Sequence, residues 1–186
     1  MSASSGIDRA AAVRQALLEL VADRGLHGAA MGEVARRAGV AAGTIYVHYA
    51  DKESLILTVY AEVKRDLGLA AAAGWDSGVP PEKRFLGAWH RVHAHLVERP
   101  ERARFLLQLE ASPYGKAVHQ FEGEVAGLWS AMIAELGHIL VDLPPDVLYD
   151  LALGPAVTLA ASAGGSATDD STLDTVARGC WRAITR

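Results

Sequence analysis

Length, composition and charge narrow the classes of protein to which this chain can belong. The chain has 186 residues, 51% of them hydrophobic, and a formal net charge of −4, which suits one domain or two small domains with an ample core. No run of about 18 uninterrupted apolar residues occurs and no basic stretch precedes an apolar one at the N-terminus, so we expect neither a membrane span, nor a membrane partner, nor a secretory signal. The single cysteine, Cys180, fits a reducing compartment, and the expected location is cytoplasmic.

The first third of the chain predicts four helices in close succession. They are expected over residues 8–24, 32–38, 42–49 and 51–69. Gly25 is expected to end the first helix, and Asp51 is a suitable N-cap for the fourth. Residues 1–52 would form a small N-terminal domain, which the helix over 51–69 joins to the rest.

The remainder of the chain, residues 53–186, predicts a second and larger helical domain. No stretch alternates with a period of two, so no sheet is expected. The first clear break is the stretch Ala70–Pro81, which is rich in Ala and Gly and ends in two prolines. Helices are expected over residues 82–98, from 100 onward, from 112 to about 139, over 146–163 with a kink at 154–155, and over 171–184. The predicted fold class is therefore all-α, with about nine helices.

The segment Val34–Tyr49 has the layout of a helix-turn-helix. Its sequence is Val-Ala-Arg-Arg-Ala-Gly-Val-Ala-Ala-Gly-Thr-Ile-Tyr-Val-His-Tyr. Ala35 is small enough for two helices to approach closely, Gly39 can adopt the left-handed conformation that ends a helix, and Ile45 would fill the gap between the helices. A unit of this kind places its second helix in the major groove of DNA.

The longer stretch Ala30–Ile56 resembles the DNA-binding segment of the tetracycline-repressor (TetR) family. The most specific part is Gly-Thr-Ile-Tyr-Val-His-Tyr, followed after one residue by Asp-Lys-Glu-Ser-Leu. The chain departs from the family at Ala30 and Ala41, where a Ser or Thr would cap a helix and could contact phosphate. The resemblance implies an N-terminal three-helix DNA-binding unit followed by a helical ligand-binding and dimerisation domain.

Eight residues are candidates for contact with double-stranded DNA. They are Arg37, Ala42, Gly43, Thr44, Tyr46, His48, Tyr49 and Lys52. Gly43 would let the backbone approach the duplex, and Tyr46 could contact a thymine methyl or a phosphate. Lys52 would hold a phosphate, and the resemblance implies the same for His48 and Tyr49. An alternative interpretation makes Tyr46 and Tyr49 core aromatics and Lys52 a solvated charge.

The expected DNA-reading helix contains no Arg, Lys, Asn or Gln, the side chains that bind bases through paired hydrogen bonds. Residues 1–52 hold six basic and five acidic side chains, whereas residues 53–186 hold 12 basic and 17 acidic, so electrostatic attraction to DNA should be weak. We therefore expect readout by apolar contact, backbone approach and DNA shape. A symmetric homodimer would bind a palindromic operator.

By resemblance, the last two helices pair with those of a second subunit. Candidate dimer residues are Leu151, Leu159, Val176, Trp181 and Ile184, and the small residues that would permit close approach are Ala152, Ala156, Ala160, Ala161 and Gly164. The alternative is that these helices pack only within one subunit.

The same resemblance implies that the other helices enclose a cavity for an unidentified small effector that is apolar or amphipathic. Candidate lining residues are Trp89, His93, Phe105, Phe121, Trp129 and Met132. A stripe of large apolar residues at helical spacing also fits a plain core. The fourth helix would carry movement from this domain to the DNA-binding unit.

Three functions remain open. The leading prediction is a dimeric, ligand-responsive repressor; the first alternative is an adaptor with the same fold that binds protein. The second alternative is a metal protein or enzyme that uses His90, His93 and His95. No carboxylate or cysteine stands at matching spacing, and no catalytic arrangement accompanies the histidines, so we expect no metal, no cofactor and no enzymatic activity.

Overall fold

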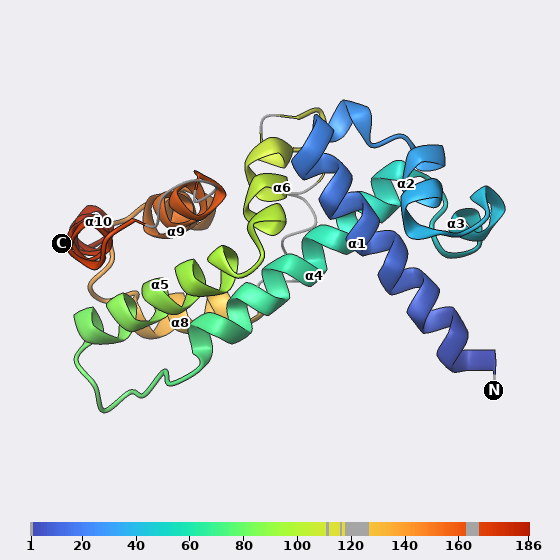
Figure 1. Cartoon of the computed structure of the whole chain (residues 1–186). Helices are drawn as coiled ribbons and strands as arrows, with labels where there is room; N and C mark the ends of the chain where they lie inside the picture. The colour runs from blue at the N-terminus through green and yellow to red at the C-terminus, as the bar shows by residue number, and fades with distance from the viewer. Residues whose placement is uncertain (1, 111, 116, 118–126, 163–167) are drawn as a thin grey trace.

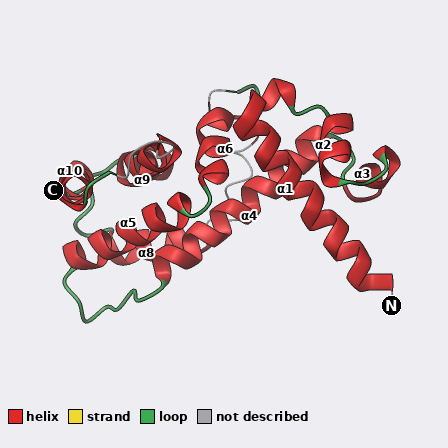
Figure 2. Ribbon diagram, viewed as in Figure 1, coloured by secondary structure: helices red, strands yellow, loops and turns green. Residues whose placement is uncertain are grey.

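The computed structural model describes residues 2–110, 112–115, 117, 127–162 and 168–186, with side chains from residue 9 onward. These residues form helices and loops, apart from one isolated antiparallel bridge between Leu140 and Thr185 (Figure 2). The helices are α1 (Ser2–Gly28), α2 (Met31–Ala38), α3 (Ala42–His48), α4 (Lys52–Ala72), α5 (Pro81–Val97), α6 (Pro100–Glu110), α8 (Gly127–Leu136), α9 (Pro145–Ser162) and α10 (Asp170–Ile184). The described part thus confirms the predicted all-α class with nine helices.

Helices α1 to α3 form the N-terminal unit (Figure 1). The first helix begins at Ser2, before the predicted start at residue 8, and it is interrupted at Gly25, where φ is 75° and ψ is 169°. Only glycine adopts this conformation readily, so the predicted stop at Gly25 is confirmed, with one further turn beyond it. The core of the unit is formed by side chains that have no exposed surface, namely Val13, Leu17, Leu20, Val21, Val34 and Ile45.

Helix α4 connects the two parts of the molecule (Figure 1). It begins as predicted after Asp51, whose carboxylate accepts from the Ser54 backbone N–H at 2.7 Å while the Ser54 hydroxyl accepts from the Asp51 N–H at 3.2 Å. This reciprocal capping box satisfies two of the N–H groups at the helix start. The helix continues to Ala72, three residues beyond the prediction.

The C-terminal part packs α5 against α4, α9 and α10, with α6 between α9 and α1 (Figure 1). The long helix predicted over 112–139 is described only as α8, which ends at Leu136. It stops there because the following backbone bonds to the end of the chain: Arg186 N–H donates to the Ile139 carbonyl at 3.0 Å and Val141 N–H to that of Ile184 at 2.9 Å. Helix α9 contains Pro155 and continues to Ser162.

None of the described helices combines the length and the apolar character that a membrane span requires.

Candidate nucleic-acid interface and effector cavity

The turn between α2 and α3 has the predicted geometry. Gly39 is left-handed, with φ 66° and ψ 28°, and the Val40 N–H donates to the Ala35 carbonyl at 3.0 Å. Ala35 is 3% exposed and Ile45 is fully buried, so the small residue lies at the close approach and Ile45 fills the gap. The helix-turn-helix is therefore present as the spacing predicted.

Both helices of this unit begin without a side-chain cap. Ala30 and Ala41 are the N-cap residues of α2 and α3, with dihedral angles in the extended region and no side-chain hydrogen bond. A Ser or Thr at either position could accept from an N–H group of the first turn. The two departures from the family pattern thus fall on the cap positions themselves.

The outer face of α3 is exposed and mainly apolar. Tyr46 is 58% exposed and Val47 is 78% exposed, while Ala42, Gly43 and His48 are also exposed and Thr44 is half-buried. The core interpretation of Tyr46 is therefore wrong. Sequence reasoning missed Val47, although its position four residues after Gly43 places both on one helix face.

Tyr49 lies in the core instead of on this face. It is 6% exposed, and its hydroxyl accepts from Arg14 Nη1 at 3.2 Å, while Arg14 Nε contacts a Glu62 carboxylate oxygen at 2.5 Å. For Tyr49 the structure favours the alternative interpretation of a core aromatic. Its contacts join α1, α3 and α4.

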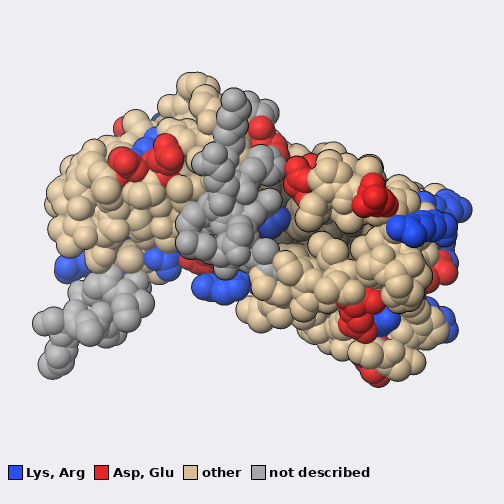
Figure 3. Space-filling model, turned by 180° about the vertical axis from the view of Figure 1, so that it is seen from behind, with Lys and Arg blue, Asp and Glu red and all other residues tan. Residues whose placement is uncertain are grey.

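The basic candidates are held by partners within the chain. Lys52 Nζ donates to the Leu26 carbonyl at 2.5 Å, and burial lowers the pKa of this amine. Arg37 contacts Glu19 at 3.1 Å and Asp23 at 2.9 Å. On the face shown in Figure 3, basic and acidic side chains are interspersed. Lys52 and Arg37 thus form contacts within the protein, and their charges are partly occupied there. This agrees with the weak electrostatic attraction to DNA that the charge distribution predicts.

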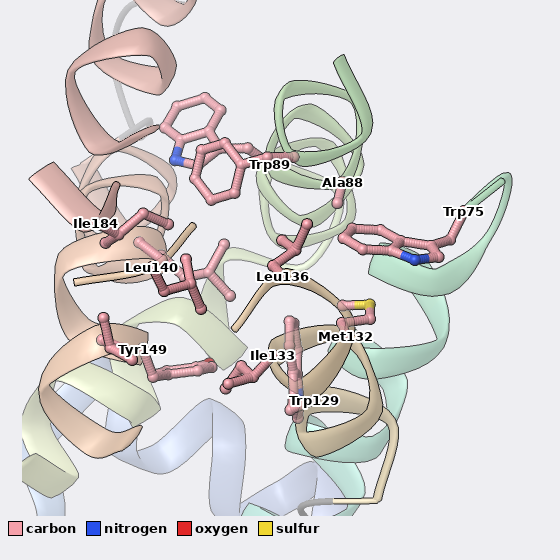
Figure 4. Close-up of a pocket in the computed structure, with 14 residues that line it drawn as sticks. Trp75, Ala88, Trp89, Trp129, Met132, Ile133, Leu136, Leu140, Tyr149 and Ile184 are labelled. Carbon is pink, nitrogen blue, oxygen red and sulfur yellow. The ribbon is translucent and has the colours of Figure 1, made fainter. Parts of the chain in front are cut away.

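A cavity of about 70 Å³ lies among α5, α8, α9, α10 and the loop after α4 (Figure 4). Trp89, Trp129 and Met132 line it, as predicted. The described residues that line it are Trp75, Phe85, Ala88, Trp89, Trp129, Met132, Ile133, Leu136, Leu140, Leu148, Tyr149, Ala152, Leu153 and Ile184.

Three predicted lining residues are placed elsewhere or not described. Phe105 is fully buried but does not line the cavity. His93 lies behind the lining, with its ring stacked on Trp89 at 5.7 Å between centroids; burial, and then the charge of His90, lower its pKa. Phe121 lies outside the described residues. Nothing in the sequence indicated that Trp75 lines the cavity, because it lies in a loop. Tyr149 was not identified as a lining residue because it lies among the many apolar residues of α9.

The loop after α4 is fastened to α8 beside the cavity. Trp75 Nε1 donates to Glu135 Oε2 at 2.7 Å, Arg84 pairs with the other oxygen of Glu135, and the Arg84 guanidinium lies 5.1 Å from the Trp75 ring. The hydrogen bond from Trp75, with those from Arg84 and Ser77, holds the pKa of Glu135 below its usual value. Trp75 is thereby held as one wall of the cavity.

The three histidines of α5 have separate partners. His90 Nε2 contacts Asp174 at 2.8 Å, His93 stacks on Trp89, and His95 Nε2 lies 3.4 Å from Arg102. Within the residues that the structure describes, no group of three or more His, Cys, Asp or Glu side chains could hold a metal ion. The described contacts of these histidines are therefore one polar contact to a carboxylate, one ring stack and one contact to a guanidinium group.

The predicted dimer residues divide into two groups. Leu151 is 39% exposed, next to Val147 at 38%, on the outer face of α9, and Leu159, Val176 and Trp181 are half-buried. In contrast, Ile184 is 4% exposed and lines the cavity. Of the small residues, Ala156 and Ala160 are fully buried within the subunit, Ala152 lines the cavity, and Gly164 is outside the described residues.

Helix α6 is attached to α1 through Gln108, which sequence reasoning missed. Its side-chain amide donates to the Val21 carbonyl at 2.9 Å and accepts from the Leu26 N–H at 3.2 Å. These two bonds lie on either side of the break at Gly25. Helix α6 is therefore a second structural connection between the N-terminal unit and the C-terminal part, beside α4.

Two family models match the chain. Residues 13–59 match the model described as bacterial regulatory proteins, tetR family, and residues 80–185 match that described as tetracyclin repressor-like, C-terminal domain. The second match alone covers more than half of the chain, and the boundary between the two falls after the N-terminal unit described above.

Individual relatives agree with these matches. An uncharacterized HTH-type transcriptional regulator of Haemophilus influenzae is 27% identical over 179 residues, which are 95% of this chain and 96% of that protein. A crystal structure of a TetR-family transcriptional regulator from Haemophilus influenzae Rd is 26% identical, covers 100% of both chains and has a TM-score of 0.76. FadR from Bacillus subtilis in complex with stearoyl-CoA covers 92% of this chain and 95% of its own, with a TM-score of 0.70; at 15% identity this shows the fold alone. The chain belongs to the TetR family of transcriptional regulators, which are not enzymes, and it combines an N-terminal helix-turn-helix with a C-terminal ligand-binding domain.

Proposed function

We propose that the protein is a homodimeric repressor that binds a palindromic operator through α3 and is released by a small apolar or amphipathic effector. The observation that carries this proposal is the outer face of α3. Tyr46 and Val47 are 58% and 78% exposed, whereas Ile45 beside them is fully buried and fastens the helix to its unit. Exposed aromatic and branched side chains on a well-packed helix reduce solubility, so their presence indicates an interaction surface. Such side chains can make apolar contacts with thymine methyl groups in the major groove.

The chemistry of this face defines the kind of DNA recognition. Gly43 and Ala42 permit close backbone approach, and Tyr46 offers both a ring and a hydroxyl. Because Arg37 and Lys52 are occupied by internal partners, few phosphate charges would be neutralised per subunit. Specificity would come from apolar contact and DNA shape, and binding would require two subunits.

The outer face of α9 supports a dimer. Val147 and Leu151 expose 38% and 39% of their surface four residues apart, so they lie on the same helix face. A second copy of the chain would cover them, as would be expected for the isologous interface of a two-fold dimer. Trp181, Val176 and Leu159, which are half-buried, would border this contact.

Release by an effector requires a link between the cavity and α3. Helix α4 runs from the N-terminal unit to the C-terminal helices (Figure 1), the loop after it supplies Trp75 to the cavity wall, and Gln108 of α6 bonds to the α1 backbone. An effector that binds more tightly to a state in which α4 and α6 have shifted would lower operator affinity by that difference. FadR, which shares the fold, is described in complex with stearoyl-CoA, and this supports a small-molecule effector here.

Operator binding can be tested by fluorescence anisotropy with DNA from upstream of the gene. Wild-type protein should bind at low salt, and Tyr46→Ala should lower the affinity at least about ten-fold, because an aromatic contact at the centre of a small interface is lost. Val97→Ala is the matched control, since Val97 is 42% exposed but lies on α5. Absence of binding by the wild-type protein at low salt would contradict the proposal.

The dimer is tested separately by sedimentation. Leu151→Asp should convert a dimer to a monomer and weaken operator binding together with it, because a charge would be buried at the interface. A wild-type protein that sediments as a monomer at micromolar concentration would contradict the proposed symmetry.

A further inference from the structure

Among the described residues, those that line the cavity include no charged side chain, although charged groups lie close behind two of its walls. All of the lining residues are apolar or aromatic. Figure 4 shows that they come from the loop after α4, from helices of the C-terminal part and, at Leu140, from the segment between α8 and α9, with Trp75 at one side and Tyr149 at the other. Each of these two aromatic rings has a charged cluster beside it.

Tyr149 separates the cavity from a second hollow of about 240 Å³, because it lines both. Lys64 lies on the second side, with its Nζ 3.1 Å from the centroid of the Tyr149 ring. Glu110 and Asp150 also line the second hollow. The positive charge therefore interacts with the ring face, and two carboxylates accompany it.

Trp75 separates the cavity from the other charged cluster. Its indole N–H is bonded to Glu135, and Arg84 is paired with the same carboxylate. The guanidinium group of Arg84 and the carboxylate of Glu135 form a salt bridge, so their opposite charges neutralise each other. Neither Arg84 nor Glu135 lines the cavity.

Three polar atoms of the wall have no hydrogen-bond partner among the described residues. They are Trp89 Nε1, Trp129 Nε1 and Tyr149 Oη, all of which are buried. The Trp89 indole N–H lies beside the Cys180 thiol, which is a weak acceptor. Trp129 and Tyr149 have no such neighbour in the described part of the chain, and their rings meet edge to face, with centroids 5.5 Å apart. An indole N–H can only donate, and an unbonded phenol hydroxyl has a donor to offer. A buried donor without an acceptor is costly, and a bound acceptor would remove that cost.

We propose that the effector is an uncharged, mainly apolar molecule with a hydrogen-bond acceptor oxygen, such as a ketone, ester or lactone, and that Trp129 and Tyr149 select it. This inference rests on the proposed function, because it names the chemical class of the molecule that enters the cavity. The apolar part of the effector would contact the apolar lining residues, among them Trp89 and Ile184. Its oxygen would accept a hydrogen bond from the Trp129 indole N–H or the Tyr149 O–H.

Charged molecules are excluded by the same arrangement. A carboxylate or an ammonium group in the cavity would lose its hydration without meeting an opposite charge. An anionic head could reach Lys64 only by displacing Tyr149, and it would then meet the carboxylates of Glu110 and Asp150. A cationic head on that path would meet Lys64 itself.

The size of the cavity connects binding to movement. At about 70 Å³ it is smaller than the roughly 150 Å³ apolar cavity that accommodates benzene, so its walls must move to admit an effector. Gly68 of α4 lies against this wall, since a Cβ at that position would lie 3.3 Å from Trp129 Nε1. Reorientation of Trp129 toward a bound oxygen would therefore change its contact with α4.

Four molecules that share ten carbons and a phenyl ring test the chemical class. They are butyrophenone, butylbenzene, 4-phenylbutyrate and 4-phenylbutylamine, and their binding to the full chain without DNA is measured by calorimetry. Butyrophenone should bind about ten-fold more tightly than either charged compound and about five-fold more tightly than butylbenzene, which has no acceptor.

Two variants assign the selectivity to the wall donors. Trp129→Phe and Tyr149→Phe should each remove most of the preference for butyrophenone over butylbenzene and leave the affinity for butylbenzene unchanged. Tyr114→Phe is the matched control, because Tyr114 lines a different hollow beside Leu26 and Lys52. Both wall variants should melt at or above the wild-type temperature, since each removes an unsatisfied donor.

Three results would overturn the inference: tighter binding of 4-phenylbutyrate or 4-phenylbutylamine than of butyrophenone, an unchanged ketone preference in both wall variants, or no binding of any of the four compounds. Operator affinity, measured in parallel, separates this inference from the proposed function. Butyrophenone that binds without changing operator affinity would contradict release by an effector and leave the chemical class intact. Release by 4-phenylbutyrate alone would support the function and overturn the class.

Discussion

The N-terminal unit and the C-terminal helices place their functional side chains in opposite directions. In α3, the candidate residues point outward and the core needs only Ile45 from this short helix. Around the cavity, the lining residues point inward and come from the loop after α4, the segment between α8 and α9, and the helices α5, α8, α9 and α10. An outward face depends on one short stretch of sequence, whereas an inward face depends on how distant stretches pack.

This difference explains which side-chain positions could be predicted from the sequence. Ile45 and Tyr46 are neighbours, and the helical period alone makes one buried and the other exposed. Trp89 and Phe105 are both fully buried, yet only Trp89 lines the cavity. The helical periodicity of the sequence predicts that a side chain is buried. It does not predict whether the buried side chain lies in the core or in the cavity wall.

The largest expected effect tests the inward region. Trp89→Ala should lower the free energy of unfolding by about 3–5 kcal/mol, because a large, fully buried ring is removed from the core. Tyr46→Ala, in which an exposed ring is removed, should change it by less than about 0.5 kcal/mol. Urea unfolding followed by circular dichroism measures both, and similar losses for the two variants would abolish the distinction between the regions.

The contact between the regions is tested at Gly25. Gly25→Ala should destabilise the protein by about 1–3 kcal/mol, because its backbone conformation is one that only glycine adopts readily. The added Cβ would also lie 3.3 Å from Gln108 Oε1, at the attachment of α6 to α1. The control is Gly32→Ala, which lies in helix α2 with no atom within 4 Å of the added Cβ and should be neutral or stabilising. A melting temperature that falls equally in both variants would contradict a special role for Gly25.

The outward region can be strengthened at its helix caps. Ala41→Ser should stabilise the protein by about 1 kcal/mol, because Ala41 has the extended dihedral angles of an N-cap and makes no side-chain bond. Ala50→Ser, at an exposed position that caps no helix, is the control for adding a hydroxyl. If the melting temperature of Ala41→Ser is no higher than that of the wild-type protein, the first N–H groups of α3 already have acceptors.

The smallest effect concerns pH and the cavity wall. The pKa of Glu135 is lowered in the folded state by its hydrogen bonds from Trp75, Arg84 and Ser77, so its stabilising contribution is present above its ordinary pKa and is lost as pH falls through the lowered value. Trp75 should therefore loosen on acidification from about pH 5 to pH 3, seen as a change in tryptophan fluorescence. Glu135→Gln should reduce this change, and an identical acid response in the variant would assign it to other carboxylates.

Much of the fold was predictable because its boundaries have local causes. The positive φ at Gly39 and Gly25 and the capping box at Asp51 each depend on one or a few consecutive residues. The end of α8 at Leu136 was missed because its cause is remote: the C-terminal residues bond to the backbone that follows this helix. A pattern of apolar residues cannot reveal a hydrogen-bond partner more than 40 positions away.

The candidate site shows the same division. Exposure of Tyr46 was expected from the motif, but the internal partners of Lys52 and Arg37 were not, because Leu26, Glu19 and Asp23 meet them only after α1 has packed on α2 and α4. The motif identifies which side chains stand near the DNA face. Packing determines which of them remain available.

The sequence by itself determined the helical class and the helix-turn-helix, since periodicity, caps and glycine turns act over a few residues. Tertiary structure alone decided that Tyr49 is buried, that Ile184 faces a cavity, and that Trp75 and Tyr149 stand between this cavity and the charges beyond it. These outcomes depend on side chains that are brought together from distant helices. The free energy of a buried group is determined by all of its neighbours, and only the folded chain specifies them.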